Sequence, residues 1–171
     1  MSDSQNINKR APWLGRHNLP VLAALGALML LAVLLRAYKL DDQSAWWDDY
    51  NGLLNLEGKS LKTSLEMARH YNPHGAPLYH FVQYYSTFLI GKSPLGQRWL
   101  SILFGIATIP LVYLLGRETF GKKAGLIAVL CFAMSPIHIY HDQSIRLYPL
   151  MALLAAVSVY ALLRAVRGGG F

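Results

Sequence analysis

Four long apolar runs divide the chain, and more polar segments separate them. The runs cover residues 19–38, 99–116, 124–140 and 147–163. Each contains 17 or 18 consecutive residues without Asp, Glu, Lys or Arg, which is close to the shortest helix that crosses a hydrocarbon core of ~30 Å. The pattern predicts an all-α integral membrane protein with about four transmembrane helices.

The polar segments predict the orientation of these helices. Lys and Arg residues are equally numerous in the segments on the two sides of the membrane. Cytoplasmic loops are enriched in Lys and Arg, but this rule applies mainly to short loops. The short turn 117–123 contains Arg117, Lys122 and Lys123. We therefore predict a multi-pass protein of the plasma (inner) membrane with its N-terminus in the cytoplasm. Its cytoplasmic parts are the tail 1–18, the turn 117–123 and the end 164–171, and its outer parts are 39–98 and 141–146.

The large outer loop, 39–98, has helical patterns of its own. Ser44 and Gly58 are start and stop signals for a first juxtamembrane helix, and a second follows from Ser60. Residues 77–90, "PLYHFVQYYSTFLI", are apolar and rich in aromatic rings. This segment is short for a span, and aromatic side chains favour the membrane–water interface, so we predict an interfacial helix. The alternative is a fifth span.

Composition supports a membrane protein and excludes one class of partner. The chain is 54% hydrophobic and 15% charged, whereas a soluble domain carries about 25% charged residues. The net charge is +7, but the cations bracket the apolar runs instead of alternating with aromatic residues, so we predict no binding of nucleic acid. The single cysteine, Cys131, excludes an internal disulfide, and its place in an apolar run predicts a buried, inert thiol.

Two adjacent carboxylates follow the first apolar run. They are Asp48 and Asp49 in the stretch "SAWWDDYN". Neighbours on a helix point about 100° apart, so one of the two is expected to face a given site. A carboxylate at an apolar boundary is poorly solvated, which makes it a better base for removing a proton from an acceptor hydroxyl. The alternative is a solvated pair that stabilises a helix N-terminus.

The second outer segment, "IYHDQSIRLYP", also contains residue types that bind ligands. Arg146 can extend to the phosphates of the membrane or hold the phosphate of a bound lipid. His138, His141 and Asp142 are types that ligate metals, but their spacing is not specific enough to assign a site. His74, in the loop "NPHGAP", fits a ligand, an acid or base, or a loop histidine with a structural partner.

These segments together resemble a known family. The outer "DD" pair, the "PLY" helix and the segments "LLGRETFGKKAGLIA" and "SPIHIYHDQSIRLY" are similar to membrane glycosyltransferases of the C-fold class. The group is the protein O-mannosyltransferase and aminoarabinose-transferase-like enzymes, glycosyltransferase family 39. The resemblance runs from about Pro20 to Arg164. It implies transfer of a sugar from a polyprenyl-phosphate-linked donor to a protein, lipid or glycan acceptor at the outer face.

The resemblance also implies roles for particular residues. Asp48 matches the aspartate of the family's Asp-Glu pair, which acts as a base or in a metal-assisted site, and Asp49 stands where glutamate is usual. Arg146 and Tyr148 match an Arg-x-Tyr element near the donor phosphate. His74 falls in the segment that borders the site in this group. Together with His141 and Asp142, which are candidates by residue type, it is expected to line the site. A divalent metal ion stays open as a cofactor.

Chain length leads to one further expectation. Members of this family usually run to several hundred residues, and this chain has 171. The sequence is therefore interpreted as an N-terminal portion of such an enzyme, with a polyprenyl-phosphate-sugar, membrane lipids and an unknown acceptor as its partners. The alternative is a non-catalytic four-span membrane subunit or a truncated remnant.

Overall fold

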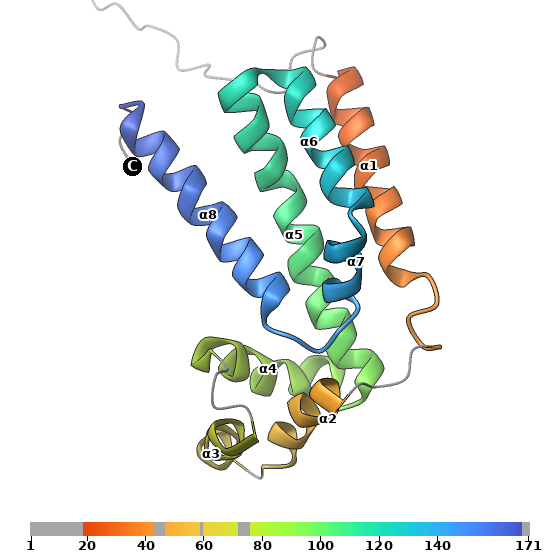
Figure 1. The fold of residues 1–171 in the computed structure, drawn as a ribbon, viewed down its shortest axis with the longest axis vertical. Helices are drawn as coiled ribbons and strands as arrows, with labels where there is room; N and C mark the ends of the chain where they lie inside the picture. The colour runs from red at the N-terminus through yellow and green to blue at the C-terminus, as the bar shows by residue number, and fades with distance from the viewer. Residues whose placement is uncertain (1–18, 43–46, 59, 72–75, 169–171) are drawn as a thin grey trace, which may run out of the picture.

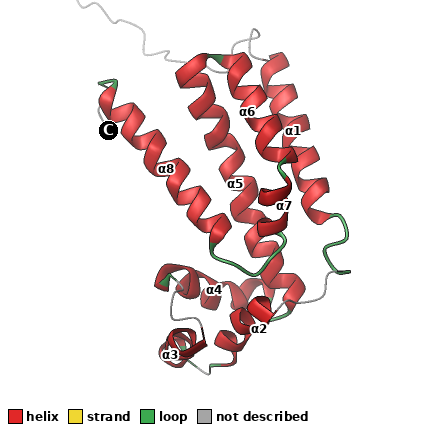
Figure 2. Cartoon of the chain, viewed as in Figure 1, coloured by secondary structure: helices red, strands yellow, loops and turns green. Residues whose placement is uncertain are grey.

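The computed structural model describes residues 19–42, 47–58, 60–71 and 76–168, and within these ranges the chain forms helices and no strand (Figures 1 and 2). Ser44 and His74 lie outside these ranges, and the side chain of Asp48 is not described. Three of the described helices are long and apolar enough to cross a membrane, or four when one bent pair counts as a single span. The all-α membrane fold predicted from the sequence is confirmed.

The membrane-sized helices run side by side (Figure 1). They are α1 (Leu19–Ala37), α5 (Pro94–Phe120), α8 (Tyr148–Val166), and the bent pair α6 (Lys122–Met134) and α7 (Pro136–Asp142). Helix α5 lies at the centre, where it contacts each of the others, and α1 packs against α6. Helices α1 and α8 lie on opposite sides of α5.

Helix α5 extends past both ends of the apolar run 99–116. Its first turn begins at Pro94, and the Ser93 side chain caps it by accepting a hydrogen bond from the backbone N–H of Gly96. It ends before Gly121, whose φ of 93° is accessible mainly to glycine. The polar ends therefore extend the helix beyond the part that hydropathy alone identifies.

The third apolar run, 124–140, is not one straight helix. It breaks at Ser135, which is extended (φ −67°, ψ 118°) and directly precedes Pro136. Proline disfavours the helical conformation in the residue before it and has no N–H to continue the helix. The two halves, α6 and α7, are bent by 59°, and the bend brings the end of α7 against α1 and α5.

The core of the bundle lies where α1, α5 and α6 meet. Its buried residues are Ala32, Ile109, Tyr113, Val129 and Ala133. Cys131 is exposed, so the predicted burial of its thiol is wrong. The buried positions of α6 are spaced four apart and lie on one face, whereas residue 131 points to the other.

The loop 39–98, predicted to be the outer loop, contributes a layer of short helices at the end of the bundle where α1 ends and α5 and α8 begin (Figure 1). It comprises α2 (Trp47–Leu54), the 3-10 turn η2 (Asn55–Glu57), α3 (Leu61–Tyr71) and α4 (Pro77–Ile90). Helix α4 covers the residues expected for the interfacial helix. Its buried face is polar and its exposed face is apolar and aromatic: Leu78, Phe81, Tyr85, Phe88 and Leu89.

Gly105 of α5 gives a first prediction. A Cβ atom at this position would overlap the carboxylate of Asp142, so the variant Gly105→Ala forces that carboxylate to move. Overpacking of this kind costs about 1–3 kcal/mol, and we expect a lower thermal unfolding midpoint in detergent. Gly26→Ala on α1 is the control, because no atom lies within 4 Å of the added Cβ. Equal midpoints for the two variants would contradict the packing described here.

Candidate active site

Asp49 joins three segments at the end of the bundle where α1 ends and α5 begins. Its side chain is buried, with 5% of the residue exposed. One carboxylate oxygen accepts a hydrogen bond from the backbone N–H of Ile145 (3.0 Å), and the other lies 3.6 Å from Nη2 of Arg98. Asp49 therefore connects α2 to α5 and to the segment between α7 and α8. Its contacts turn the carboxylate into the protein, which suits a supporting role.

Arg98, near the start of α5, connects Asp49 to the segment after α1. It is 3% exposed, and its Nη1 donates a hydrogen bond to the carbonyl oxygen of Leu40 (2.8 Å). Gly52 of α2 contributes to the same arrangement, because a Cβ there would lie 3.3 Å from the carbonyl oxygen of Ile145. Helix α2, which contains the two aspartates, is thus held closely against α5 and against the segment between α7 and α8.

A second buried ion pair joins the ends of α1 and α7. Arg36 Nε donates to Asp142 Oδ2 at 2.6 Å, and neither side chain is more than 3% exposed. Arg36 Nη1 also donates to the carbonyl oxygen of Ala133 (3.1 Å). Gln143 donates back to the carbonyl oxygen of Arg36 (2.9 Å). Asp142, expected from the sequence to line the site, is engaged in holding α7 against α1.

The structure brings Arg146, Tyr148 and His141 together at the start of α8. The guanidinium carbon of Arg146, which is half-buried, lies 6.0 Å from the centre of the Tyr148 ring. The His141 ring lies 4.6 Å from the same ring. These three residues form one cluster at the protein surface, since Tyr148 is exposed.

Tyr79 of α4 is close enough to Asp49 and Arg146 for both of their charges to act on its hydroxyl. It is buried, and burial raises the pKa of its hydroxyl above the ordinary value. The charge of Asp49 raises this pKa further, while the Ser101 hydroxyl and the charge of Arg146 oppose the increase. The hydroxyl therefore stays neutral at pH 7. Within the described part of the chain, its oxygen has no hydrogen-bond partner of good geometry.

A metal site needs several ligating side chains that converge on one point. Among the described residues, no group of three or more His, Cys, Asp or Glu side chains converges on one point. His138 stacks on Phe132, with ring centres 4.2 Å apart, while Asp142 pairs with Arg36. Within the described part of the chain, these side chains therefore do not assemble a metal site.

Two residues that shape this site, Arg36 and Arg98, were not singled out from the sequence. Each is a cation beside a stretch of consecutive uncharged, mainly apolar residues. A charged side chain at the edge of a span usually has a specific partner, because leaving it unpaired in apolar surroundings is costly. Their positions at the edges of spans therefore indicated that both arginines have partners. The identity of those partners was not evident, because they are distant in the sequence.

Comparison with known proteins agrees with the resemblance seen in the sequence. Residues 74–170 match the family described as "Dolichyl-phosphate-mannose-protein mannosyltransferase". This region includes Arg98, Asp142, Arg146 and Tyr148, whereas Asp48 and Asp49 precede it. No solved structure matches the chain.

A curated relative is the Bacillus subtilis (strain 168) protein named "Putative mannosyltransferase YkcB". It is 24% identical over 151 residues, which are 83% of this chain and 21% of that protein. The chain thus spans about a fifth of the length of the curated relative it matches. Because the family match covers more than half of its residues, the chain belongs to the dolichyl-phosphate-mannose-protein mannosyltransferase family.

Proposed function

We propose that the protein transfers a sugar from a polyprenyl-phosphate-linked donor to an acceptor at the outer face of the plasma membrane. The observation that carries the proposal is the gathering of Asp49, Tyr79 and Arg146 at one end of the bundle, in a chain of this family. A polyprenyl donor is anchored in the bilayer, so its phosphate and sugar lie at the interface. An acid and a cation at the helix ends are at the depth that such a donor requires.

The distribution of charge supports the proposed orientation. The turn 117–123 contains Arg117 in the last turn of α5 and Lys122 and Lys123 at the start of α6. It lies at the end of the bundle opposite to the outer layer formed by α2, α3 and α4 (Figure 1). Short basic connections favour the cytoplasm, so the N-terminus is assigned to the cytoplasm and the helical layer to the outside.

The proposed reaction is a displacement at the anomeric carbon of the donor. Asp48 removes the proton of an acceptor hydroxyl, and the acceptor oxygen forms a bond to that carbon. The bond between this carbon and the phosphate oxygen breaks, and its electron pair leaves with the polyprenyl phosphate. Arg146 stabilises the negative charge on the phosphate, and Tyr148 lies beside it.

Asp48 is assigned the role of base because Asp49 is engaged elsewhere. The Asp49 carboxylate interacts with Ile145 and Arg98 inside the protein. In this scheme Asp49 fixes α2 relative to the segment that leads to Arg146. Its contribution to the reaction is therefore one of positioning.

Arg146 gives the experiment that tests the proposal. Loss of one charge-stabilising group typically lowers kcat by about 10²–10³-fold, and we expect this for Arg146→Ala with a polyprenyl-phosphate-mannose donor. Arg146→Lys keeps the charge but loses the planar fork, so it should have intermediate activity. Lys92→Ala removes an exposed cation from another outer connection and is the control. Wild-type kinetics of Arg146→Ala would exclude the proposed donor site.

A further inference from the structure

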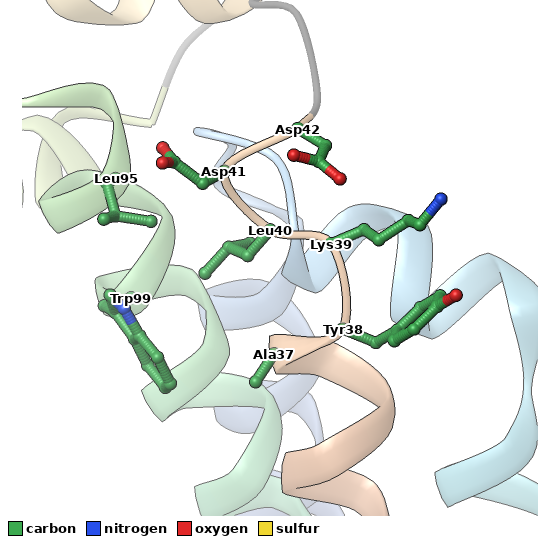
Figure 3. A pocket seen from close by; sticks show the side chains of 8 residues that line it. All are labelled: Ala37, Tyr38, Lys39, Leu40, Asp41, Asp42, Leu95 and Trp99. Atoms are coloured by element: carbon green, nitrogen blue, oxygen red, sulfur yellow. The ribbon is translucent and has the colours of Figure 1, made fainter.

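A cavity opens beside the outer ends of α1 and α5 and is not used by the reaction described above. Its volume is about 440 Å³. Leu95 and Trp99 of α5 form one wall, and Leu40 from the segment after α1 faces them (Figure 3). Asp41 directs its carboxylate toward the α5 side, and Asp42 lies on the other side of the same segment. The cavity thus combines an apolar aromatic wall with carboxylates at its rim.

The segment that forms one side of this cavity is held in place. Gln143 donates a hydrogen bond to the carbonyl oxygen of Tyr38 (3.1 Å), and Arg98 donates one to that of Leu40 (2.8 Å). Lys39 has a φ of 52°, a left-handed conformation that is unfavourable for a residue with a side chain. Such a conformation persists where surrounding contacts fix it. The cavity is therefore formed before a ligand binds, which lowers the cost of binding.

The cavity is adjacent to the proposed active site. Arg98 contacts both Leu40, which lines the cavity, and Asp49 of α2. The cavity lies at the end of α1, whereas Arg146 precedes α8, and these two helices lie on opposite sides of α5 (Figure 1). In a displacement, the incoming oxygen approaches opposite to the leaving group. The side away from the proposed phosphate site is the side from which an acceptor is expected.

The lining indicates the chemical class of the ligand. The indole of Trp99, with 37% of the residue exposed, offers a flat apolar face against which the C–H face of a sugar ring can pack. Carboxylates accept strong hydrogen bonds from hydroxyl groups. Two exposed carboxylates and one exposed cation, Lys39, line the cavity, and this excess of negative charge disfavours an anionic ligand. Charged groups are also unsuitable neighbours for a hydrocarbon chain. A neutral, hydroxylated ligand matches these properties.

We propose that this cavity is an acceptor subsite that binds a saccharide unit, with Trp99 as the stacking surface and Asp41 as an acceptor of hydroxyl hydrogen bonds. The inference rests on the proposed function and deepens it, because it assigns the acceptor to the saccharides.

The test measures binding of mannotriose to the full-length protein in detergent micelles by saturation-transfer NMR. Trp99→Ala should weaken mannotriose binding about tenfold or more, since a central tryptophan often dominates an interface. Trp99→Phe retains an aromatic ring and should weaken mannotriose binding less than Trp99→Ala does. Asp41→Asn should weaken mannotriose binding severalfold. The control is Phe120→Ala, which removes an exposed ring from the other end of the same helix and should leave binding unchanged.

A parallel titration with polyprenyl phosphate separates the two ligands. The proposal predicts that Trp99→Ala leaves polyprenyl phosphate binding at the wild-type level. Equal mannotriose binding by wild type and Trp99→Ala, absence of mannotriose binding to the wild type, or loss of polyprenyl phosphate binding in Trp99→Ala would each overturn the subsite. If the wild type still transfers sugar from the lipid donor, only the subsite fails. If it does not, the proposed function fails.

Discussion

Replacing Asp48 by asparagine is expected to lower sugar transfer by about 10²–10⁴-fold, the usual contribution of a general base. Asparagine has nearly the same size but cannot take the proton of an acceptor hydroxyl. Insertion into the membrane and thermal stability should stay at the wild-type level. The measurement is transfer of labelled mannose from a polyprenyl-phosphate donor by the full-length protein in liposomes.

The control for Asp48→Asn is Glu57→Gln. This variant makes the same change, from acid to amide, at an exposed position in the same outer layer, and it should retain transfer. If Asp48→Asn transfers sugar at the wild-type rate, the base is another group and the mechanism proposed here is wrong. If both variants lose activity together, the effect reflects the charge of the outer layer and not a specific base.

The second large effect is expected in stability, from Asp142→Ala. This change leaves the guanidinium of Arg36 buried without its carboxylate partner. Removal of one member of a buried ion pair costs about 3–5 kcal/mol, so the unfolding midpoint in detergent should fall strongly. Transfer should fall as well, because two hydrogen-bonding residues lie within three positions of Asp142: Gln143 bonds to Tyr38, and Ile145 bonds to Asp49.

The double variant Arg36→Met with Asp142→Leu distinguishes an unpaired charge from lost packing. Apolar replacement of both members of a buried pair is often neutral, so the double variant should recover most of the lost stability. Glu118→Ala is the control, because it breaks an ion pair with Arg167 whose side chains are 26% and 45% exposed. Exposed pairs contribute about 0–1 kcal/mol. A double variant as unstable as Asp142→Ala would show that the charge is not the cause.

The sequence predicted the helices of the bundle well because hydropathy is a local property. The apolar runs contain α1 and most of α5, α6 and α8. The same property did not reveal the 59° bend between α6 and α7. The signal was present in the Ser135–Pro136 pair, but an uninterrupted apolar run suggests a straight helix. Nor did it show that Cys131 is exposed, since an apolar run does not distinguish the buried face of a helix from the other.

The candidate site was predicted in part. Resemblance to the family brought Arg146 and Tyr148 to attention, and the structure has them side by side. The positions of Asp49 and Asp142 could not be predicted, because their partners are distant: Ile145 is 96 residues from Asp49, and Arg36 is 106 residues from Asp142. Such pairs follow from the packing of whole helices. Only that packing shows that Asp49 is held inside the protein, and this leaves Asp48 as the acid that is proposed to act on a substrate.

The most direct test of the proposed function is to identify the sugar donor. The full-length protein, reconstituted in liposomes, would be given mannose labelled either on a polyprenyl phosphate or on a soluble nucleotide, and transfer of the label to an acceptor would be measured. We predict label transfer from the polyprenyl donor, with release of polyprenyl phosphate, and no direct transfer from the nucleotide. Transfer from the nucleotide sugar alone would contradict the lipid-linked donor, and no transfer from either would favour a non-catalytic membrane subunit.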